Sequence, residues 1–382
     1  MAQIDLQLDK DKFLNDILNM ANFIVSDVRG YSRYHFSEFL SMNQISDELY
    51  GICIDDEDIL NLKPHLVNKL RKSQDSEYDK FCYFVGQNTD FLYELFKNTA
   101  EYFNKINFVP FNFNDCIRRF SQEDGKGIIL DFYSQYSDKY YNIVKRYFDE
   151  NRIESGYELG PFLAAIFVGA VPIKSGYIFT NEKVINSKFL STIVHEFGHV
   201  IDAETFTFPQ QKTLGIWEDA LLEIPSTCFE NIFVQQLTDK RIDYTGGLLL
   251  NNAIYLDLKE SSEVLLETLK NESYCIDDEG DSLITTKDEN DQEVEMFLPF
   301  REPLIYSLGN LFSLYFKELE KKDKVAFLKA FNNIITSRKE DSLENLICRL
   351  GVTPQDFATL KYVKSDIEEN TMKLKKRFNY HS

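Results

Sequence analysis

Residues 187–203 read SKFLSTIVHEFGHVIDA, and this stretch predicts a buried helix around which the rest of the fold is organised. Its apolar residues cover most of a helical circumference, which is typical of a helix packed on all sides: Phe189, Leu190, Ile193, Val194, Phe197, Val200 and Ile201. The polar exception is a stripe formed by Thr192, His195, His199 and Asp202. Because polar groups are costly to bury without partners, this stripe is expected to face a cavity or polar side chains.

The two histidines of the stripe have the spacing of metal ligands. His195 and His199 are four residues apart, so on a helix both imidazoles can reach one ion. Glu196 lies about 100° further round the helix, where a general base for a metal-bound water belongs. A chance match to this pattern is expected roughly 0.01 times in a chain of this composition. This rate favours a metal site over a buried helix that carries two hydrogen-bonded histidines.

The third ligand is expected to be a carboxylate. A histidine six residues beyond His199 would complete one known pattern, but that position is Thr205, and the other histidines are distant in sequence. The segment that follows offers several acidic residues: Glu218, Asp219, Glu223 and Glu230.

Helix geometry orders these candidates. Glu218 and Glu223 are five residues apart, a rotation of about 140°, so they cannot both face the same ion. Glu223 and Glu230 are seven apart and share a face, and a kink at Pro225 would re-aim the Glu223 carboxylate. The face argument favours Glu223 as ligand, with Glu230 behind it orienting an imidazole.

The remaining patterns predict a mainly helical chain. Apolar residues recur at helical intervals across residues 5–155 and again from Pro303 to Phe378. KSGYIFTNEKV predicts a short strand near Tyr177–Phe179, and the acidic residues 271–296 predict a loop or a hairpin turning at DEND.

Composition excludes several classes of partner. The formal net charge of −20 disfavours nucleic acid and anionic membranes. It would tolerate or attract cationic ligands, with a contribution to solubility alone as the alternative. The longest apolar run, residues 160–173, is too short to span a bilayer. Six scattered cysteines without CxxC spacing and the absence of a visible signal peptide predict a cytoplasmic protein.

HEFGH followed by LLEIPSTCFEN resembles the thimet oligopeptidase and oligopeptidase F family of zinc metallopeptidases. In that family the Glu of the E-[ILA]-[PA]-S segment is the third zinc ligand and a second Glu follows seven residues later. Both positions match here, as Glu223 and Glu230. SGYIFTN is similar to the strand beside the family's active site, and PLIYSLGNLFSLYF to its Tyr- and Gly-containing helix start. The likeness covers residues 160–378.

The resemblance implies a two-lobed helical metallopeptidase of the zincin type, with a small β-sheet near the active-site helix. We expect an N-terminal helical lobe at residues 1–155, shorter than in the family, and a catalytic helical domain at residues 156–382. Tyr306 matches a family tyrosine and is a candidate oxyanion donor, with core packing as the alternative. The chain departs from the family in having no histidine between His199 and His381.

These features together predict a zinc-dependent endopeptidase, or oligopeptidase, that hydrolyses unstructured and preferably cationic peptides. One Zn²⁺ per chain would be held by His195, His199 and Glu223, with Glu196 as general base. The strand residues Gly176, Tyr177 and Ile178 would pair with an extended peptide.

Three alternatives stay open. The first is an aminopeptidase-type gluzincin that uses Glu218 as its third ligand. The second is a processing peptidase with one dedicated substrate. The third is an inactive peptide-binding scaffold, although a scaffold has no need of Glu196.

Overall fold

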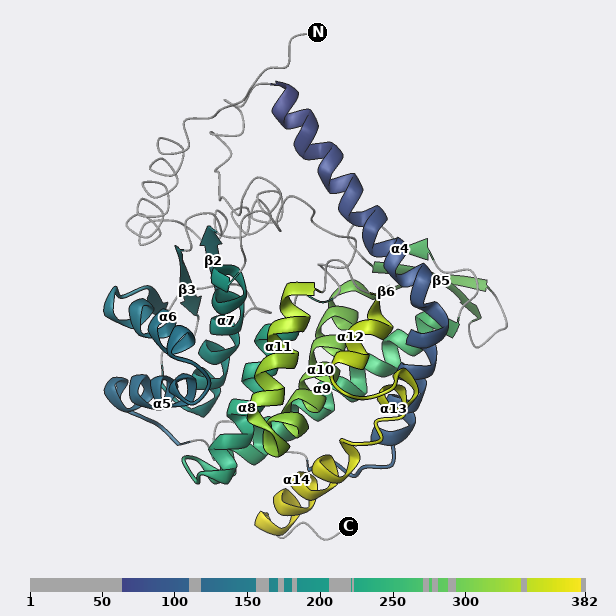
Figure 1. The fold of residues 1–382 in the computed structure, drawn as a ribbon. Helices are drawn as coiled ribbons and strands as arrows, with labels where there is room; N and C mark the ends of the chain where they lie inside the picture. The colour runs from purple at the N-terminus through teal and green to yellow at the C-terminus, as the bar shows by residue number, and fades with distance from the viewer. Residues whose placement is uncertain are drawn as a thin grey trace. The chain divides into compact units, whose positions relative to one another are not determined.

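The structure is a computed structural model (Figure 1) and describes these residues: 64–109, 118–155, 165–170, 175–180, 184–205, 221, 223–270, 275–276, 281–287, 293–337 and 342–378. The described residues are mainly helical, which confirms the predicted fold class. No described helix is both long and apolar enough to cross a membrane.

The helices are, in chain order, α4 Pro64–Phe103, α5 Gln122–Ser134, α6 Asp138–Asp149, α7 Ser187–Thr205, α8 Ile224–Asp239, α9 Tyr244–Lys270, α10 Arg301–Lys322, α11 Lys324–Ser337, α12 Leu343–Arg349, α13 Pro354–Ala358 and α14 Lys364–Arg377. The strands are β1 Ile153–Ser155, β2 Ala165–Ala170, β3 Ser175–Thr180, β4 Cys275–Ile276, β5 Asp281–Lys287 and β6 Glu293–Pro299.

The chain divides into two compact units that alternate along the sequence. The first comprises Met1–Ser76, Lys145–Lys183 and Val200–Lys212, and the second comprises Glu77–Val144, Val184–His199 and Thr213–Ser382. The predicted boundary at residue 155 therefore falls inside the first unit. The division within α7 comes after His199, so both histidines of the motif belong to the second unit.

The first unit contains the sheet β1-β3-β2. Its middle strand, β3, runs parallel to β1 and antiparallel to β2, and it confirms the strand predicted near Tyr177–Phe179. Ile178 lies opposite Ile153 on one side and Phe167 on the other. The expectation that Ile178 pairs with a peptide is corrected here, because neighbouring strands already occupy both of its sides. Peptide pairing at Gly176 and Tyr177 stays a prediction.

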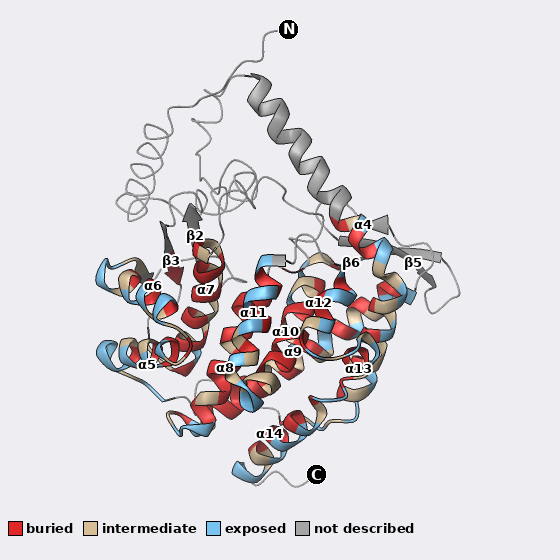
Figure 2. Cartoon of the chain, in the orientation of Figure 1, coloured by how far each residue is buried: buried red, intermediate tan, exposed pale blue. Residues whose placement is uncertain are grey.

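The second unit is built around α8, which is buried on nearly all sides (Figure 2). Helices α9 and α10 pack along it, and α11 and α14 pack against these two in turn. Phe229 of α8 occupies the centre of an aromatic cluster, with its ring centroid 4.8 Å from that of Phe331 and 5.3 Å from that of Tyr133. Such aromatic packing fixes the orientation of α8, and with it the residues at the N-terminus of the helix.

Asp243 ties the start of α7 to the start of α9. Its Oδ2 accepts hydrogen bonds from Ser187 Oγ at 2.6 Å and from the Arg118 amide at 3.0 Å. Its Oδ1 accepts from the Gly246 amide at 3.0 Å, where it caps the first turn of α9. The motif helix therefore begins at a position set by side chains from elsewhere in the same unit.

The acidic segment before α10 forms a hairpin. Strands β5 and β6 pair antiparallel from Asp281 opposite Pro299 to Lys287 opposite Glu293, which leaves DEND in the connection. Of the two structures predicted for this segment, a loop or a hairpin turning at DEND, the hairpin is confirmed.

Candidate metal centre

Helix α7 presents His195 and His199 one turn apart. The two ring centroids lie 5.2 Å apart, and the histidine side chains are 13% and 17% exposed. Val194 and Phe197, between and beside them, are fully buried, and the Val194 carbonyl accepts a hydrogen bond from Tyr133 Oη at 3.0 Å. Packing on the apolar face thus locks the rotation of the helix and directs both imidazoles to one place.

Glu223 reaches both imidazoles from the start of α8. Its Oε2 lies 3.1 Å from His195 Nε2 and 3.3 Å from His199 Nε2. Glu223 is the N-cap residue of α8, but its side chain makes no capping bond. Its Oε2 instead accepts a hydrogen bond from Ser226 Oγ at 2.6 Å. Because the Glu223 carboxylate does not cap the helix, it is free to point at the histidines, and the Ser226 hydroxyl holds it there.

Pro225 has a different role from the predicted one. Helix α8 begins at Ile224, and Pro225 lies in its first turn. At that position the missing N–H costs no intrahelical hydrogen bond, because the first amides of a helix have no partner within it. Pro225 therefore starts the described helix rather than kinking it, and it is the helix start that directs the Glu223 carboxylate.

Glu230 contacts the second ring nitrogen of His195, Nδ1. Its Oε2 lies 2.9 Å from His195 Nδ1, and its Oε1 accepts a hydrogen bond from Ser191 Oγ at 3.0 Å. The contact on Nδ1 leaves Nε2 of the same ring directed at Glu223. A carboxylate behind a histidine in this way sets the tautomer and orientation that a metal ligand needs.

Two glycines let three helices approach the site closely. A Cβ on Gly198 would come within 2.3 Å of Ser226 Cα, and a Cβ on Gly309 within 3.0 Å of Glu223 Cβ. Gly198 belongs to α7 and Gly309 to α10, so both helices contact the beginning of α8 through bare backbone. Any larger residue at Gly198 would push α7 away from Glu223.

The electrostatics of the cluster favour an added positive charge. Burial alone lowers the pKa of His195, but hydrogen bonds to Glu223 and Glu230 raise it well above its ordinary value. Burial raises the pKa of Glu223, whereas His199 and His195 lower it well below its usual range. The buried carboxylate is therefore ionised, and the charge that balances it is carried by a proton or by a metal ion.

Glu196 and Tyr306 lie beside these groups. Glu196 is buried, and its charge raises the pKa of both His199 and Tyr306. The ring of Tyr306, on α10, stacks at 6.5 Å from that of His195 and is 42% exposed. The charge of Glu223, followed by burial and by Glu196, raises the pKa of Tyr306, so its phenol stays protonated and able to donate a hydrogen bond.

His195, His199 and Glu223, called the metal cluster from here on, fit a zinc ion. Their donor atoms all lie within 4.8 Å of one another. Two imidazole nitrogens and one carboxylate oxygen are a common ligand set for catalytic zinc, and they leave a coordination position open. No second set of three such donors occurs among the described residues.

Several residues that shape the site were not predicted from the sequence. Ser191 and Ser226 orient the two carboxylates, and Gly198 and Gly309 permit the close approach of the helices. The fourth residue of HEFGH, Gly198, offered a usable signal, since glycine inside a helix suggests a close contact. Glu218 lies outside the described residues.

No known family model matches the chain, and no curated protein matches it. Among solved structures, the chain is similar to one described as a peptidase from Chlamydophila abortus, with 14% identity and a TM-score of 0.43 over 78% of this chain and 55% of that one. It is also similar to one described as an oligoendopeptidase F from Bacillus anthracis strain Ames, with 13% identity and a TM-score of 0.48 over 92% and 65% of the two chains.

A third similar structure is PZ peptidase A with an inhibitor, at 12% identity and a TM-score of 0.47 over 77% of this chain and 58% of that one. The chain thus spans less than two thirds of each of these three structures. Likeness at this level does not assign an activity to this chain.

Proposed function

We propose that the chain is a zinc-dependent endopeptidase that hydrolyses unstructured peptides. The observation that carries the proposal is the convergence of His195 Nε2, His199 Nε2 and Glu223 Oε2, with Glu196 and Tyr306 beside them. His195, His199 and Glu223 would hold one zinc ion per chain. When bound, zinc supplies Lewis acidity, which polarises a peptide carbonyl and lowers the pKa of water.

The side chains of the chain itself account for the proton transfers. Glu196 takes a proton from the attacking water and passes it to the leaving amine, which otherwise departs as an unstable anion. Tyr306, kept protonated by its acidic surroundings, donates a hydrogen bond to the oxygen on which negative charge develops. Glu230 and Ser226 bind no substrate in this scheme; they hold His195 and Glu223 in position.

The position of Glu223 supports this function over an aminopeptidase that uses Glu218 as its third ligand. Glu223 already lies in hydrogen-bonding range of both histidines. Within the described part of the chain, Cys228 and Cys348 are free thiols, which supports a reducing compartment such as the cytoplasm.

The test is Glu196→Gln, compared with the wild type for zinc content and for cleavage of a quenched fluorescent peptide library. We expect the variant to keep about one zinc per chain and to lose activity roughly a thousandfold or more, since the general base is gone while the ligands remain. The matched control is Glu263→Gln, which removes an exposed carboxylate of α9 outside the site.

Comparable turnover by the wild type and Glu196→Gln would refute the mechanism. If the wild type binds peptides but cleaves none of the library, the peptide-binding scaffold replaces the enzyme. Loss of zinc in Glu196→Gln would place this residue among the ligands instead.

A further inference from the structure

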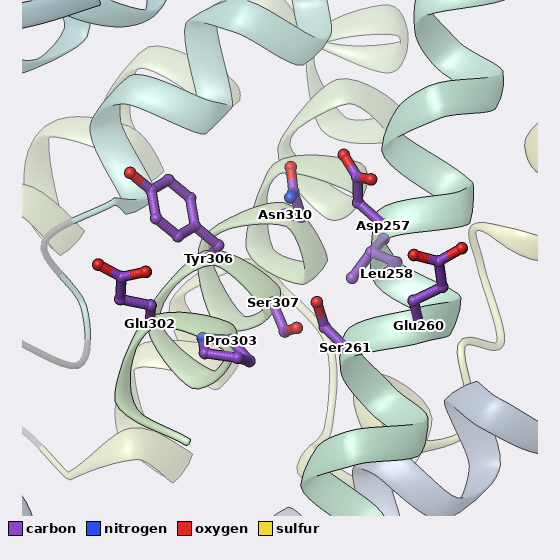
Figure 3. A pocket seen from close by; sticks show the side chains of 9 residues that line it. All are labelled: Asp257, Leu258, Glu260, Ser261, Glu302, Pro303, Tyr306, Ser307 and Asn310. Atoms are coloured by element: carbon purple, nitrogen blue, oxygen red, sulfur yellow. The ribbon is translucent and has the colours of Figure 1, made fainter. Parts of the chain in front are cut away.

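A pocket opens beside the metal cluster, between α9 and α10. It has a volume of about 310 Å³. Helix α9 contributes Asp257, Leu258, Glu260 and Ser261 to its lining, and α10 contributes Glu302, Pro303, Tyr306, Ser307 and Asn310 (Figure 3). This is the lower end of the range for small-molecule sites, and it suits a single long side chain rather than a whole peptide.

The lining is strongly acidic. Asp257, Glu260 and Glu302 all belong to it, and no lining residue is basic. Among the described residues none of these three carboxylates is paired with a lysine or an arginine. Partial burial, together with the charges of Glu260 and Glu230, raises the pKa of Asp257 from 3.8 to about 6. The negative charge in this pocket is therefore uncompensated and would be relieved by a cation.

A buried hydroxyl in the same lining has no partner. Ser307 is only 2% exposed, and within the described part of the chain its Oγ makes no hydrogen bond. Figure 3 shows the hydroxyls of Ser307 and Ser261 between the two helices, with Asp257 and Glu260 on the α9 side. A buried hydroxyl without a partner is uncommon, because its desolvation is not offset. A ligand that donates hydrogen bonds would satisfy it.

The pocket adjoins the proposed catalytic site through Tyr306. Tyr306 lines the pocket and also stacks on His195. Asn310 lines it and accepts a hydrogen bond from Asn231 of α8 at 3.0 Å. Asp257 lies close enough to Glu230, the partner of His195, for the charge of Glu230 to raise its pKa. A group seated in the pocket therefore lies next to the proposed catalytic site, within reach of a peptide that extends from it.

We propose that this pocket is a specificity subsite for an organic cation of the peptide substrate, an alkylammonium or guanidinium group. The inference rests on the proposed peptidase function and names the class of peptide that it prefers. The cation would donate to the carboxylates of Asp257, Glu260 and Glu302 and to Ser307 Oγ, while Leu258 and Pro303 would contact its hydrocarbon stem.

A metal ion is a poorer occupant of the pocket. The carboxylates of Asp257, Glu260 and Glu302 do not form a set of metal donors within 4.8 Å of one another, as the metal cluster does. Carboxylates spread round a pocket suit a group with several N–H donors on a long stem. Such a group has two sources in a peptide, a lysine or arginine side chain and the free terminal amine.

The experiment compares short quenched peptides that carry lysine or its uncharged counterpart norleucine at each position around the cleaved bond. Each peptide is made with an acetylated and with a free N-terminus. We expect kcat/KM of the wild type to favour the cationic form at one position by about tenfold or more. A preference for lysine over norleucine that survives acetylation identifies a side chain, whereas a preference for the free over the acetylated terminus in the norleucine peptides identifies the amine.

Two variants of equal charge separate the pocket from general attraction. Asp257→Asn with Glu260→Gln removes two carboxylates that line the pocket, whereas Glu263→Gln with Glu267→Gln removes two from the same helix that do not line it. The ratio of cationic to neutral kcat/KM should fall close to one in the first variant and stay near the wild-type ratio in the second. Ser307→Ala should lower this ratio several-fold while the melting temperature stays equal or rises.

The same peptides are also tested for binding to Glu196→Gln by fluorescence anisotropy. A preference for cations in binding, with no cleavage by the wild type, would overturn the peptidase function and leave the subsite standing. Cleavage without any preference for cations, or a preference that both charge variants reduce equally, would overturn the subsite and leave the peptidase function standing.

Discussion

Helix α10 contributes to two buried clusters of charged side chains that differ in how their charge is balanced. One is the metal cluster, which α10 contacts through Gly309 and Tyr306. The other surrounds Lys317, which is 1% exposed and whose Nζ lies 2.7 Å from Asp366 Oδ2 of α14 and 3.3 Å from Tyr255 Oη of α9.

The Lys317 network, formed by Lys317, Tyr255, Asp366, Asn370 and Gln235, supplies its own cation. Asn370 Nδ2 donates to Gln235 Oε1 at 3.0 Å and to Tyr255 Oη at 3.2 Å, so α8, α9, α10 and α14 all take part. Burial lowers the pKa of Lys317, but Tyr255 and Asp366 raise it above its ordinary value. The ammonium therefore stays charged and paired at neutral pH.

The metal cluster differs because, among the described residues, neither Glu223 nor Glu230 pairs with a lysine or an arginine. Its carboxylates face imidazoles, which are neutral or charged depending on what binds. The comparison teaches that burial of charge alone does not mark a functional site. The proposed site differs in that no lysine or arginine of the described chain balances its buried carboxylates.

The largest expected effect concerns zinc affinity. Glu223→Ala removes one of three ligands and should weaken zinc binding by more than about a hundredfold, whereas Glu230→Gln should weaken it by roughly 10- to 100-fold. Glu218→Ala is the matched control and should keep zinc. Elemental analysis and competition with a chelator measure all three. If Glu218→Ala alone loses zinc, Glu223 is not the ligand, and an aminopeptidase that uses Glu218 replaces the proposed endopeptidase.

The second prediction concerns the Lys317 network, where a substitution should affect stability but not zinc content. Lys317→Met leaves Asp366 buried with less compensation and should lower the free energy of unfolding by about 3 kcal/mol, with no change in zinc content. Lys321 also pairs with Asp366, but the Lys321 side chain is 33% exposed. Lys321→Met should therefore lower the free energy of unfolding by less than about 1 kcal/mol. Urea unfolding gives both values. Equal costs, or zinc loss in Lys317→Met, would show that the two clusters are not separate.

The third prediction tests the close approach of α7 to α8. Gly198→Ala places a methyl group against the backbone of Ser226 and should destabilise the protein by about 1–3 kcal/mol while weakening zinc binding. Gly127→Ala, on α5 with nothing within 4 Å of its added Cβ, should stabilise by about 0.5–1 kcal/mol. Thermal unfolding and zinc titration of the two variants compare the sites. Normal zinc affinity in Gly198→Ala would mean that the helix spacing does not control the ligands.

The smallest expected effect is the pH response of the Lys317 network. Burial raises the pKa of Asp366, but Lys317 and Lys321 lower it below its ordinary value. Stability from a lowered carboxyl pKa is present above the unfolded value, roughly 3.9, and is lost as pH falls through the folded value. The stability that comes from the raised pKa of Lys317 is present at lower pH and is lost only above roughly pH 10.4.

The difference in unfolding free energy between the wild type and Lys317→Met should therefore change by less than about 0.5 kcal/mol between pH 5 and pH 8. It should shrink only below roughly pH 3.9. Urea midpoints measured at matched pH values test this. A difference that already declines near pH 6 would mean that another group controls the network.

Local sequence patterns were sufficient to predict a mainly helical chain and the helical face that His195 and His199 share. Spacing alone predicts that His195 and His199 share a helical face, because an α-helix returns to the same side after about four residues. Seven-residue spacing relates Glu223 to Glu230, and the structure brings both to His195. The same reasoning misplaced the role of Pro225, since it could not tell a kink within a helix from the start of one.

The sequence by itself determined which residues carry ligand chemistry and which helical face presents them, since both depend on residue type and on the fixed period of a helix. Only the tertiary structure decided that Glu223 meets two imidazoles, that Ser226 and Ser191 hold the carboxylates, and that Asp257 and Ser307 line one pocket. These contacts join segments whose spacing along the chain has no period. They depend on how closely helices approach, which side-chain volumes such as the missing Cβ of Gly198 set through packing.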